Sequence, residues 1–404
     1  MVEHSERPAQ RMHFAAEAYL DHVMGEMNME HYLDNAATTK PCAEAAAAVM
    51  SCISSHYGNP SSLHRKGLEA QHEMEYARNQ LAGALGCKPQ EIVFTSGATE
   101  STNLALCGAA AAYGRKRKKI ITSAVEHASV KETMAHLETL GFQIVQVCPD
   151  GNGIYHAEDF LQEADKDTCL ISIMLVNNEN GYRMPVEDVF RTLKRRDPEI
   201  ITHCDAVQGF LKIPFKTRTL CADLVSVSGH KVHALKGAGA LYVRHGVRLK
   251  PVLFGSHQEK GLRPGTESVP LIAAFGAAAE KLAPTTELRY TQVSALRSSL
   301  IAQLREMEDV VIREIPGASP YVLNFSLLGY RSEIVLHFLE QRGVFVSSGS
   351  ACSKGASSGV LETFGAKPAE VDSALRISFC AENTEEDIAA LVQGLKEAQK
   401  ELMH

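Results

Sequence analysis

Two hydrophobic patterns alternate along residues 70–245. Short apolar runs such as LISIMLV at 170–176 predict strands, and stretches with apolar residues at helical spacing lie between them. Near-continuous apolar strands are typical of parallel sheets, because helices cover both faces of such a sheet. The alternation therefore predicts an α/β fold with a mostly parallel sheet. Strands are expected at 91–95, 119–122, 142–147, 168–176, 200–205, 224–228 and 240–243, and helices at 68–85, 99–113, 130–140 and 186–196.

The pattern changes after residue 271. An alanine-rich helix and a long helical stretch to about 307 precede strand-like segments at 322–327, 343–347 and 374–379, with helices at 333–342 and after Thr384. This indicates a second, smaller α/β domain. Residues 1–30 are best interpreted as a loosely attached extension. We therefore expect an extension at 1–30, an N-terminal segment of the small domain at 31–44, a large domain at 45–275 and the small domain at 276–404.

Composition and charge favour a cytoplasmic globular protein and argue against several other classes. The chain has 404 residues, 45% hydrophobic and 22% charged, as in soluble globular proteins of two domains. A net charge of -7 gives no indication of binding to nucleic acid or to an anionic membrane, and no apolar run resembles a membrane span or a signal peptide. Ten cysteines without a CxxC pair indicate reduced thiols, with no disulfide framework and no metal site. The RKRKK run at 115–119 is expected to be a solvated turn.

Polar clusters follow three of the predicted strands. The segment 96–100, Ser-Gly-Ala-Thr-Glu, leads into a helix whose backbone N–H groups could bind a phosphate, although an ordinary helix start looks the same. Asp205 ends one strand, and Lys231 follows another in the tetrapeptide Ser-Gly-His-Lys. A lysine and an acid at neighbouring strand ends are what pyridoxal phosphate (PLP) needs, for covalent attachment and for pairing with the ring nitrogen. Taken singly, a surface lysine and a helix-capping aspartate would explain them equally well.

A second candidate lies in a loop of small residues. Ser347–Gly359 contains nine Ser or Gly in thirteen residues, with Cys352 near its middle. Such a loop is expected to be exposed and mobile, and a cysteine there is placed to react rather than to pack. Composition alone leaves an incidental loop thiol equally open.

Ten motifs follow one another along the chain: YLDNAATT (32–39), GNPSSLH (58–64), EIVFTSGATES (91–101), TSAVEHASV (122–130), VNNENG (176–181), HCDAVQ (203–208), SVSGHK (226–231), GLRPGTE (261–267), VSSGSAC (346–352) and LRISF (375–379). In this order they resemble the motifs of the NifS/IscS-type cysteine desulfurases, within the class V aminotransferases. The resemblance runs from about Tyr32 to the C-terminus and implies a fold-type-I PLP-dependent transferase.

The resemblance implies a role for each cofactor contact. Lys231 resembles the lysine that carries PLP and moves the proton at the substrate α-carbon. Asp205 resembles the partner of the ring nitrogen and Gln208 the partner of the ring hydroxyl oxygen. His127 resembles the catalytic side chain that stacks on the ring and does acid/base work, and Asn178 a further cofactor contact. The residues that resemble the family's phosphate contacts are Ala98, Thr99, Ser228 and His230, with Thr266 reaching across from the second subunit of a homodimer.

The resemblance also implies the substrate and the reaction. Arg376 resembles the clamp on the carboxylate of L-cysteine, which suits a bidentate guanidinium, with Asn178 and Asn35 as further polar contacts. Cys352 resembles the residue that takes the sulfur as a persulfide, leaving L-alanine. The long stretch between Cys352 and Arg376 resembles the branch that hands sulfur directly to an acceptor protein, such as an iron–sulfur scaffold or a tRNA-thiolation enzyme.

The chain departs from the family's motifs at three places, and three other functions remain open. The chain departs from the family at Ser256-His257, at Ala234-Leu235 and at Cys380-Ala381, all near the expected site. They put the loop conformation and the preferred acceptor in doubt. A selenocysteine lyase or another class V aminotransferase would leave Cys352 incidental, and a non-catalytic sulfur-assembly scaffold could have kept the fold.

Overall fold

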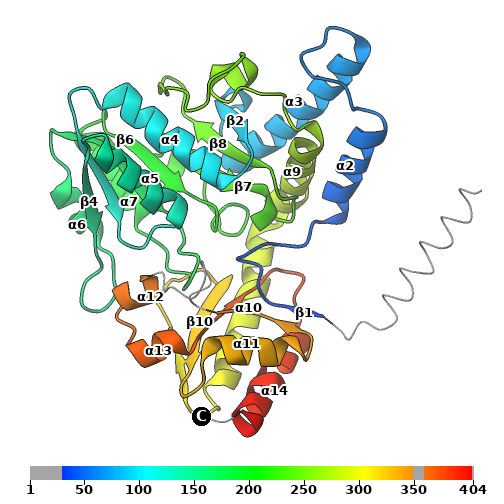
Figure 1. The fold of residues 1–404 in the computed structure, drawn as a ribbon, viewed down its shortest axis with the longest axis vertical. Coiled ribbons are helices and arrows are strands. Elements are labelled where there is room, and N and C mark those ends of the chain that lie inside the picture. Colours follow the sequence, from blue (N-terminus) through cyan, green and yellow to red (C-terminus); the bar gives the residue numbers. More distant parts are fainter. Residues whose placement is uncertain (1–29, 349–358, 403–404) are drawn as a thin grey trace, which may run out of the picture.

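The computed structural model describes residues 30–348 and 359–402 and is built around a seven-stranded sheet (Figure 1). All its strands run parallel except β8, which pairs antiparallel with both of its neighbours. The predicted α/β fold with a mostly parallel sheet is confirmed. The strand order is β2 (Ile92–Thr95), β8 (Gly239–Val243), β7 (Leu224–Ser228), β6 (Ile201–Asp205), β5 (Thr168–Met174), β3 (Lys119–Ser123) and β4 (Gln143–Val147).

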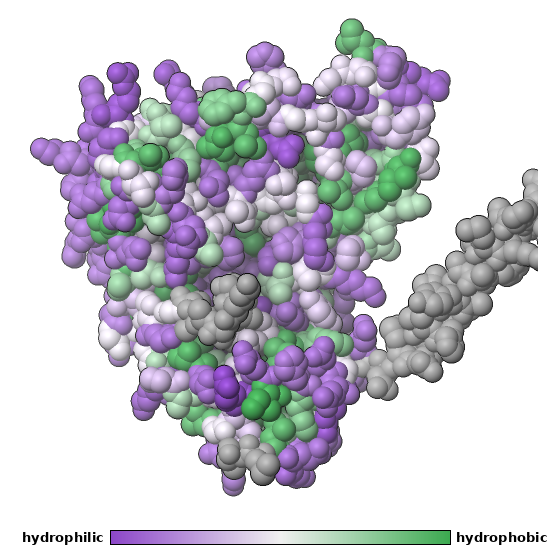
Figure 2. All heavy atoms as spheres, in the orientation of Figure 1, coloured by the Kyte–Doolittle hydropathy of each residue, from purple (hydrophilic) through white to green (hydrophobic). Residues whose placement is uncertain are grey.

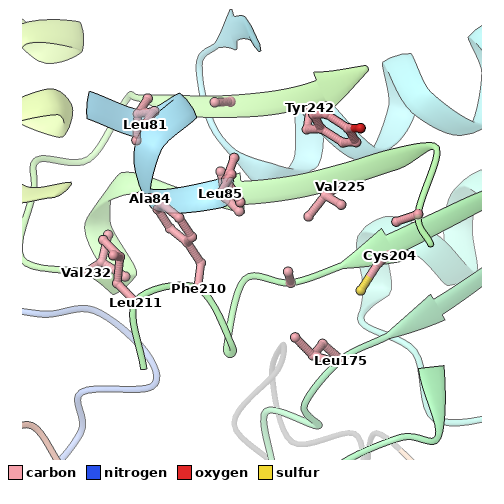
Figure 3. Close-up of a cluster of buried hydrophobic side chains, with 14 of the residues drawn as sticks. Leu81, Ala84, Leu85, Leu175, Cys204, Phe210, Leu211, Val225, Val232 and Tyr242 are labelled. Atoms are coloured by element: carbon pink, nitrogen blue, oxygen red, sulfur yellow. The ribbon is translucent and has the colours of Figure 1, made fainter. Parts of the chain in front are cut away.

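Helices cover both faces of this sheet because its strands are apolar on both sides. Ile120 belongs to a buried cluster with α4 (Ala98–Tyr113) and α5 (Ala128–Thr139). The next residue, Ile121, points to the opposite face and joins the larger cluster, part of which Figure 3 shows. The helices on that second side are α2 (Ala43–Ser54), α3 (Arg65–Leu85), α6 (Ala157–Glu163), α7 (Val186–Arg196) and α9 (Val269–Leu282).

Most predicted elements lie within a few residues of those observed. Helix α3 ends as its sequence predicts, because Gly86 takes the left-handed conformation (φ 72°) that closes a helix. The basic run at 115–119 differs at its last residue. Arg115 and Lys116 lie in the expected exposed turn, but Lys119 is buried in β3 and its Nζ lies 3.3 Å from Asp165 Oδ2.

A second, four-stranded antiparallel sheet forms the smaller body of the molecule. Its order is β12 (Ser347–Ser348), β13 (Ala374–Ser378), β10 (Val322–Leu327) and β9 (Val310–Ile312). Nearby lie α10 (Thr286–Leu304), α11 (Ser332–Glu340), α12 (Val360–Thr363), α13 (Pro368–Asp372) and α14 (Glu385–Glu401). The N-terminal strand β1 (His31–Tyr32) pairs in parallel with β11 (Val344–Phe345), so the start of the described chain belongs to this body.

The buried side chains support a division into two domains. Leu33 packs in one cluster with residues from Val293 to Leu395, separate from the clusters of the large sheet. Helix α9 belongs to the large-sheet cluster as far as Leu282, and the boundary expected at residue 275 falls inside this helix. We therefore propose a boundary near residue 283. None of the described helices combines the length and apolar character that a membrane crossing requires.

Candidate active site

A cavity of about 590 Å³ lies where the carboxyl ends of β5, β6 and β7 meet the start of α4 and Arg376 of β13. The pairing of these strands aligns Met174 with Asp205, and both side chains line the cavity. This is the edge at which open parallel sheets hold their ligands. Among the residues predicted from the sequence, the cavity brings together Ala98, Thr99, His127, Asn178, Asp205, Gln208, Ser228, His230, Lys231 and Arg376.

Lys231 is placed by a short 3₁₀ turn, η2 (Gly229–Lys231), directly after β7. Its Nζ donates to the carbonyl oxygens of Ala36 (2.7 Å) and Ala37 (2.6 Å). The segment that carries these carbonyls is tied to the same turn, because Thr39 donates from both N and Oγ1 to the carbonyl oxygen of His230. The N-terminal segment thus forms one wall of the cavity and holds the lysine amine.

Asp205 and Gln208 lie one turn apart at the end of β6, and each is 5% exposed. Asp205 accepts from the backbone N–H of Val207 at 3.0 Å. Burial raises the pKa of its carboxyl, and the nearby charges of His127 and Lys231 act in the opposite direction. A cationic N–H beside Asp205 would therefore favour the ionised carboxylate.

The opposite end of the cavity is suited to an anion. Helix α4 begins at Ala98 without a side-chain cap, so its first backbone N–H groups have no helical acceptor. Ser228 and His230 border the same space. Burial, followed by the charge of Lys231, lowers the pKa of His230 to about 4, which keeps its ring neutral at neutral pH. Glu100 is held by Arg263 through Oε1 and by the Ser96 N–H through Oε2.

His127 is the residue at which α5 begins, and its ring lines the cavity. The ring Nδ1 accepts from the backbone N–H of Ser129 at 3.1 Å and lies 2.9 Å from its hydroxyl. In the neutral ring the proton then sits on Nε2. The imidazole is therefore fixed in orientation with one N–H available to a ligand.

Arg376 reaches the cavity from β13, in the smaller body. Its Nη2 donates to Asp34 Oδ1 at 2.8 Å and its Nη1 to the carbonyl oxygen of Asn178 at 3.2 Å. Its Nε is buried and has no hydrogen-bond partner among the described residues. A guanidinium held in this way offers donors in a fixed plane, which suits a carboxylate.

Two of the predicted residues that the structure describes, Asn35 and Thr266, do not line this cavity. Asn35 corrects one expectation: it is buried, and its Nδ2 donates to the carbonyl oxygens of Ser378 (3.0 Å) and Tyr32 (3.3 Å). It anchors the N-terminal segment to β13 instead of facing a ligand. Thr266 is exposed, and its expected contact across a dimer stays a prediction. Cys352 lies outside the described residues.

Four residues of the site were missed by the sequence reasoning. Asp34 pairs with Arg376, Lys236 lines the cavity, Lys212 donates to Gln208 Oε1 at 2.8 Å, and Glu126 lies buried near Asp205. Burial raises the pKa of Glu126 to about 8. Asp34 stands in the motif at 32–39 and Lys212 one helical turn after Gln208, so spacing held a signal for both.

Comparison with known proteins agrees with this geometry. The sequence profile of the aminotransferase class-V family matches residues 31–391. The chain belongs to the class-V aminotransferase family. It is 38% identical to a cysteine desulfurase of Trichormus azollae over 377 residues, 92% of this chain and 93% of that protein. A solved NifS-like protein superposes with a TM-score of 0.87 at 36% identity, covering 93% of this chain and 100% of that one. SspA, solved in complex with cysteine, gives a TM-score of 0.76 at 31% identity, covering 88% and 100%.

Within this family the chain belongs with the NifS/IscS-type cysteine desulfurases, and its departures from their motifs have definite positions. Lys236 and Gly237, next to Ala234-Leu235, line the main cavity. Glu259, after Ser256-His257, is buried and pairs with Arg78 at 2.6 Å. Cys380 borders a small cavity behind Lys231, and burial raises the pKa of its thiol to about 11.

Proposed function

We propose that this chain is a PLP-dependent cysteine desulfurase that converts L-cysteine to L-alanine and takes up the sulfur as a persulfide on Cys352. The observation that carries the proposal is a single cavity lined by Lys231, Asp205 and Arg376. A lysine for covalent attachment, an acid for the ring nitrogen and a guanidinium for a carboxylate form a combination that neither a plain hydrolase nor a binding module needs. The likeness to SspA, which was solved in complex with cysteine, supports cysteine as the substrate.

The residues present fit the cofactor. The uncapped start of α4, with Thr99, Ser228 and His230, offers donors for a phosphate. Burial disfavours the ionised form of the Asp205 carboxyl. A protonated ring nitrogen beside it would favour that form again, so the two groups are complementary. Gln208 lines the same cavity and would contact the ring hydroxyl oxygen. When bound, PLP supplies an electron sink that makes the α-proton of an amino acid removable.

The other steps fall to the chain's own side chains. Arg376 would orient the substrate carboxylate, because Asp34 and Asn178 fix its guanidinium. Lys231 would take and return the proton at the substrate α-carbon, since Ala36 and Ala37 hold its amine in the cavity. Met174 and Val176 line the same space with apolar surface and keep water from it.

Cys352 takes the sulfur from the substrate. Its thiolate attacks the substrate sulfur, and the new S–S bond forms as the C–S bond breaks. The electron pair of the broken bond stays on the substrate carbon, which takes up a proton and becomes the methyl group of alanine. The persulfide is then passed to a thiol of an acceptor protein, an iron–sulfur scaffold or a tRNA-thiolation enzyme, in the cytoplasm.

We further propose that the enzyme is a homodimer in which Thr266 contacts the phosphate bound by the second subunit. Thr266 is exposed and does not line the cavity of its own chain, which this arrangement would explain. Large apolar side chains, among them Met50 (63% exposed) and Ile53 (58% exposed), lie on the outer side of α2. Figure 2 shows apolar surface on the right, over this helix. Contact with a second copy would remove it from water.

One assay tests the proposal against its alternatives. Purified enzyme supplied with PLP, L-cysteine and a reductant is expected to release sulfide and alanine in equal amounts. An aminotransferase would instead yield a keto acid without sulfide, a selenocysteine lyase would turn over selenocysteine while leaving cysteine untouched, and a scaffold would release nothing. Any of these three results would overturn the proposal.

A further inference from the structure

We propose that Lys212 is a positioning residue that fixes the amide of Gln208 and thereby sets the proton affinity of the bound cofactor. The inference rests on the proposed function, because it concerns the oxygen of PLP beside Gln208. Lys212 does not line the main cavity and acts through its neighbour.

A continuous chain of hydrogen bonds joins Lys212 to the catalytic amine. Lys212 Nζ donates to Gln208 Oε1 at 2.8 Å, and Gln208 Nε2 donates to the carbonyl oxygen of Ala36 at 3.0 Å. The same carbonyl oxygen accepts from Lys231 Nζ at 2.7 Å. Lys212 and Gln208 are four residues apart in a tight turn and are both 5% exposed, so water hardly competes for these bonds.

The chemistry of the two ends decides which way the amide points. The Lys212 amine carries N–H groups whether it is protonated or neutral, and it donates one of them to the oxygen of the Gln208 amide. A carbonyl only accepts, so Ala36 must face the amide nitrogen. With one N–H on Ala36, the second N–H of Gln208 is left for the cavity that Gln208 lines. Lys212 therefore ensures that Gln208 presents a donor to the ligand.

The surroundings of Lys212 argue against a packing role. The small cavity that it borders is lined by Arg289, Tyr321, Cys380 and other residues, none of them an aspartate or glutamate in the described chain. Burial, then the charge of Lys231, lowers the pKa of Lys212 to about 7. The Tyr321 ring, whose centroid lies 6.0 Å from Lys212 Nζ, offsets part of the cost of burying this charge. A buried ammonium costs stability that an apolar side chain of similar volume would not.

Other titratable groups also face this position. Lys231, Arg376 and Arg289 oppose the charge on Lys212, and Lys212 in turn lowers the pKa values of His230 and His233. The raised pKa of Cys380 keeps that thiol neutral. Among these groups, Lys212 is the one that donates a hydrogen bond to Gln208. Removing it takes away both a positive charge and the restraint on the amide.

The expected consequence has a definite sign. Without Lys212, the ring oxygen of the cofactor loses a fixed donor and a nearby positive charge, so its negative form is less stabilised. The pKa read from the pH titration of the cofactor's visible band should rise by about one unit in Lys212→Met, a tenfold gain in proton affinity. Lys212→Gln keeps a neutral donor for the Gln208 oxygen and should shift the pKa by less.

The test titrates the visible band of purified wild-type enzyme, Lys212→Met, Lys212→Gln and a control, Lys40→Met, which removes an exposed lysine near the same wall. The control should match wild type. Thermal unfolding should show Lys212→Met at least as stable as wild type, since a buried charge is removed. A wild-type enzyme without a cofactor band would overturn the proposed function itself. A wild-type band with an unchanged pKa in both Lys212 variants would overturn the role of Lys212 alone.

A double variant separates positioning from plain electrostatics. In a Gln208→Leu background the amide is gone, so adding Lys212→Met should shift the pKa only by the part that the charge of Lys212 contributes directly, which is less than the shift in the wild-type background. A second shift as large as the first would show that Lys212 acts directly on the cofactor and would contradict positioning through Gln208.

Discussion

The Nη2 of Arg376 lies 2.8 Å from Oδ1 of Asp34, and this ion pair ties β13 to the segment whose carbonyls hold Lys231. Both partners are at least partly buried, with side-chain exposures of 10% and 21%. The pair therefore fixes the guanidinium before any substrate arrives. Nη1 and Nη2 each carry a second N–H, so a substrate carboxylate would bind through the donors left on these two nitrogens.

Arg376→Lys should weaken substrate binding, because an ammonium cannot keep Asp34, Asn178 and a carboxylate in one plane. We expect KM for L-cysteine to rise about 10- to 100-fold, with cofactor content unchanged. Steady-state kinetics measure this. Arg313→Lys is the matched control, since Arg313 is partly buried in the same body, pairs with Glu370 and does not line the cavity. An equal rise in KM in both variants would speak against a substrate contact.

Lys231→Ala should abolish turnover and covalent attachment of the cofactor. Borohydride treatment followed by peptide mass spectrometry should fix PLP on Lys231 in the wild-type enzyme and on no peptide of the variant. Lys236→Ala is the control, because Lys236 lines the same cavity and should leave the attachment intact. Cofactor found covalently bound in Lys231→Ala would show that another lysine carries it.

Asp205→Asn should retain PLP but react slowly, because an amide no longer favours a protonated ring nitrogen. We expect kcat to fall on the order of 100-fold while the cofactor content stays near that of wild type. Absorbance measures the cofactor content, and alanine release measures kcat. Unchanged kcat would remove Asp205 from the mechanism.

Much of the fold could be predicted because the large sheet is apolar on both faces and its helices carry local stop signals. Val186–Arg196 was predicted with its observed bounds, and Gly86 ends α3 as expected. The strands at 119–122 and 168–176 were placed within two residues. Local pattern did not reveal that Lys119 finds a partner in Asp165, since that ion pair forms only when distant segments meet.

The residues of the site, too, could be predicted only in part from the sequence. Lys231, Asp205 and Gln208 follow strands directly, so their convergence could be inferred from the chain. Asn35 stands in an equally strong motif, yet its side chain bonds β13, because the path of the N-terminal segment decides which way it points. The hydrophobic pattern does not distinguish the buried Lys212 from an exposed lysine, and only its spacing of one helical turn from Gln208 pointed to the site.

Deletion of residues 1–28 should leave the thermal midpoint and the desulfurase rate nearly unchanged. The segment that follows is secured from His31 onward, through its N–H to the Gly343 carbonyl (2.8 Å) and its ring to Asp387 (2.8 Å). Thermal unfolding and sulfide release compare the two forms. A drop of many degrees on deletion would show that the extension docks on the rest of the protein.

The central claim is that sulfur passes through Cys352, and peptide mass spectrometry tests it most directly. Wild-type enzyme treated with L-cysteine without reductant should carry one added sulfur on the peptide that contains Cys352. Cys352→Ala should keep the cofactor and still bind L-cysteine, as judged by the visible spectrum, yet release almost no sulfide. The buried Cys380, whose pKa is raised to about 11, should remain unmodified. Persulfide found only on another cysteine, with sulfide release intact in Cys352→Ala, would contradict the account.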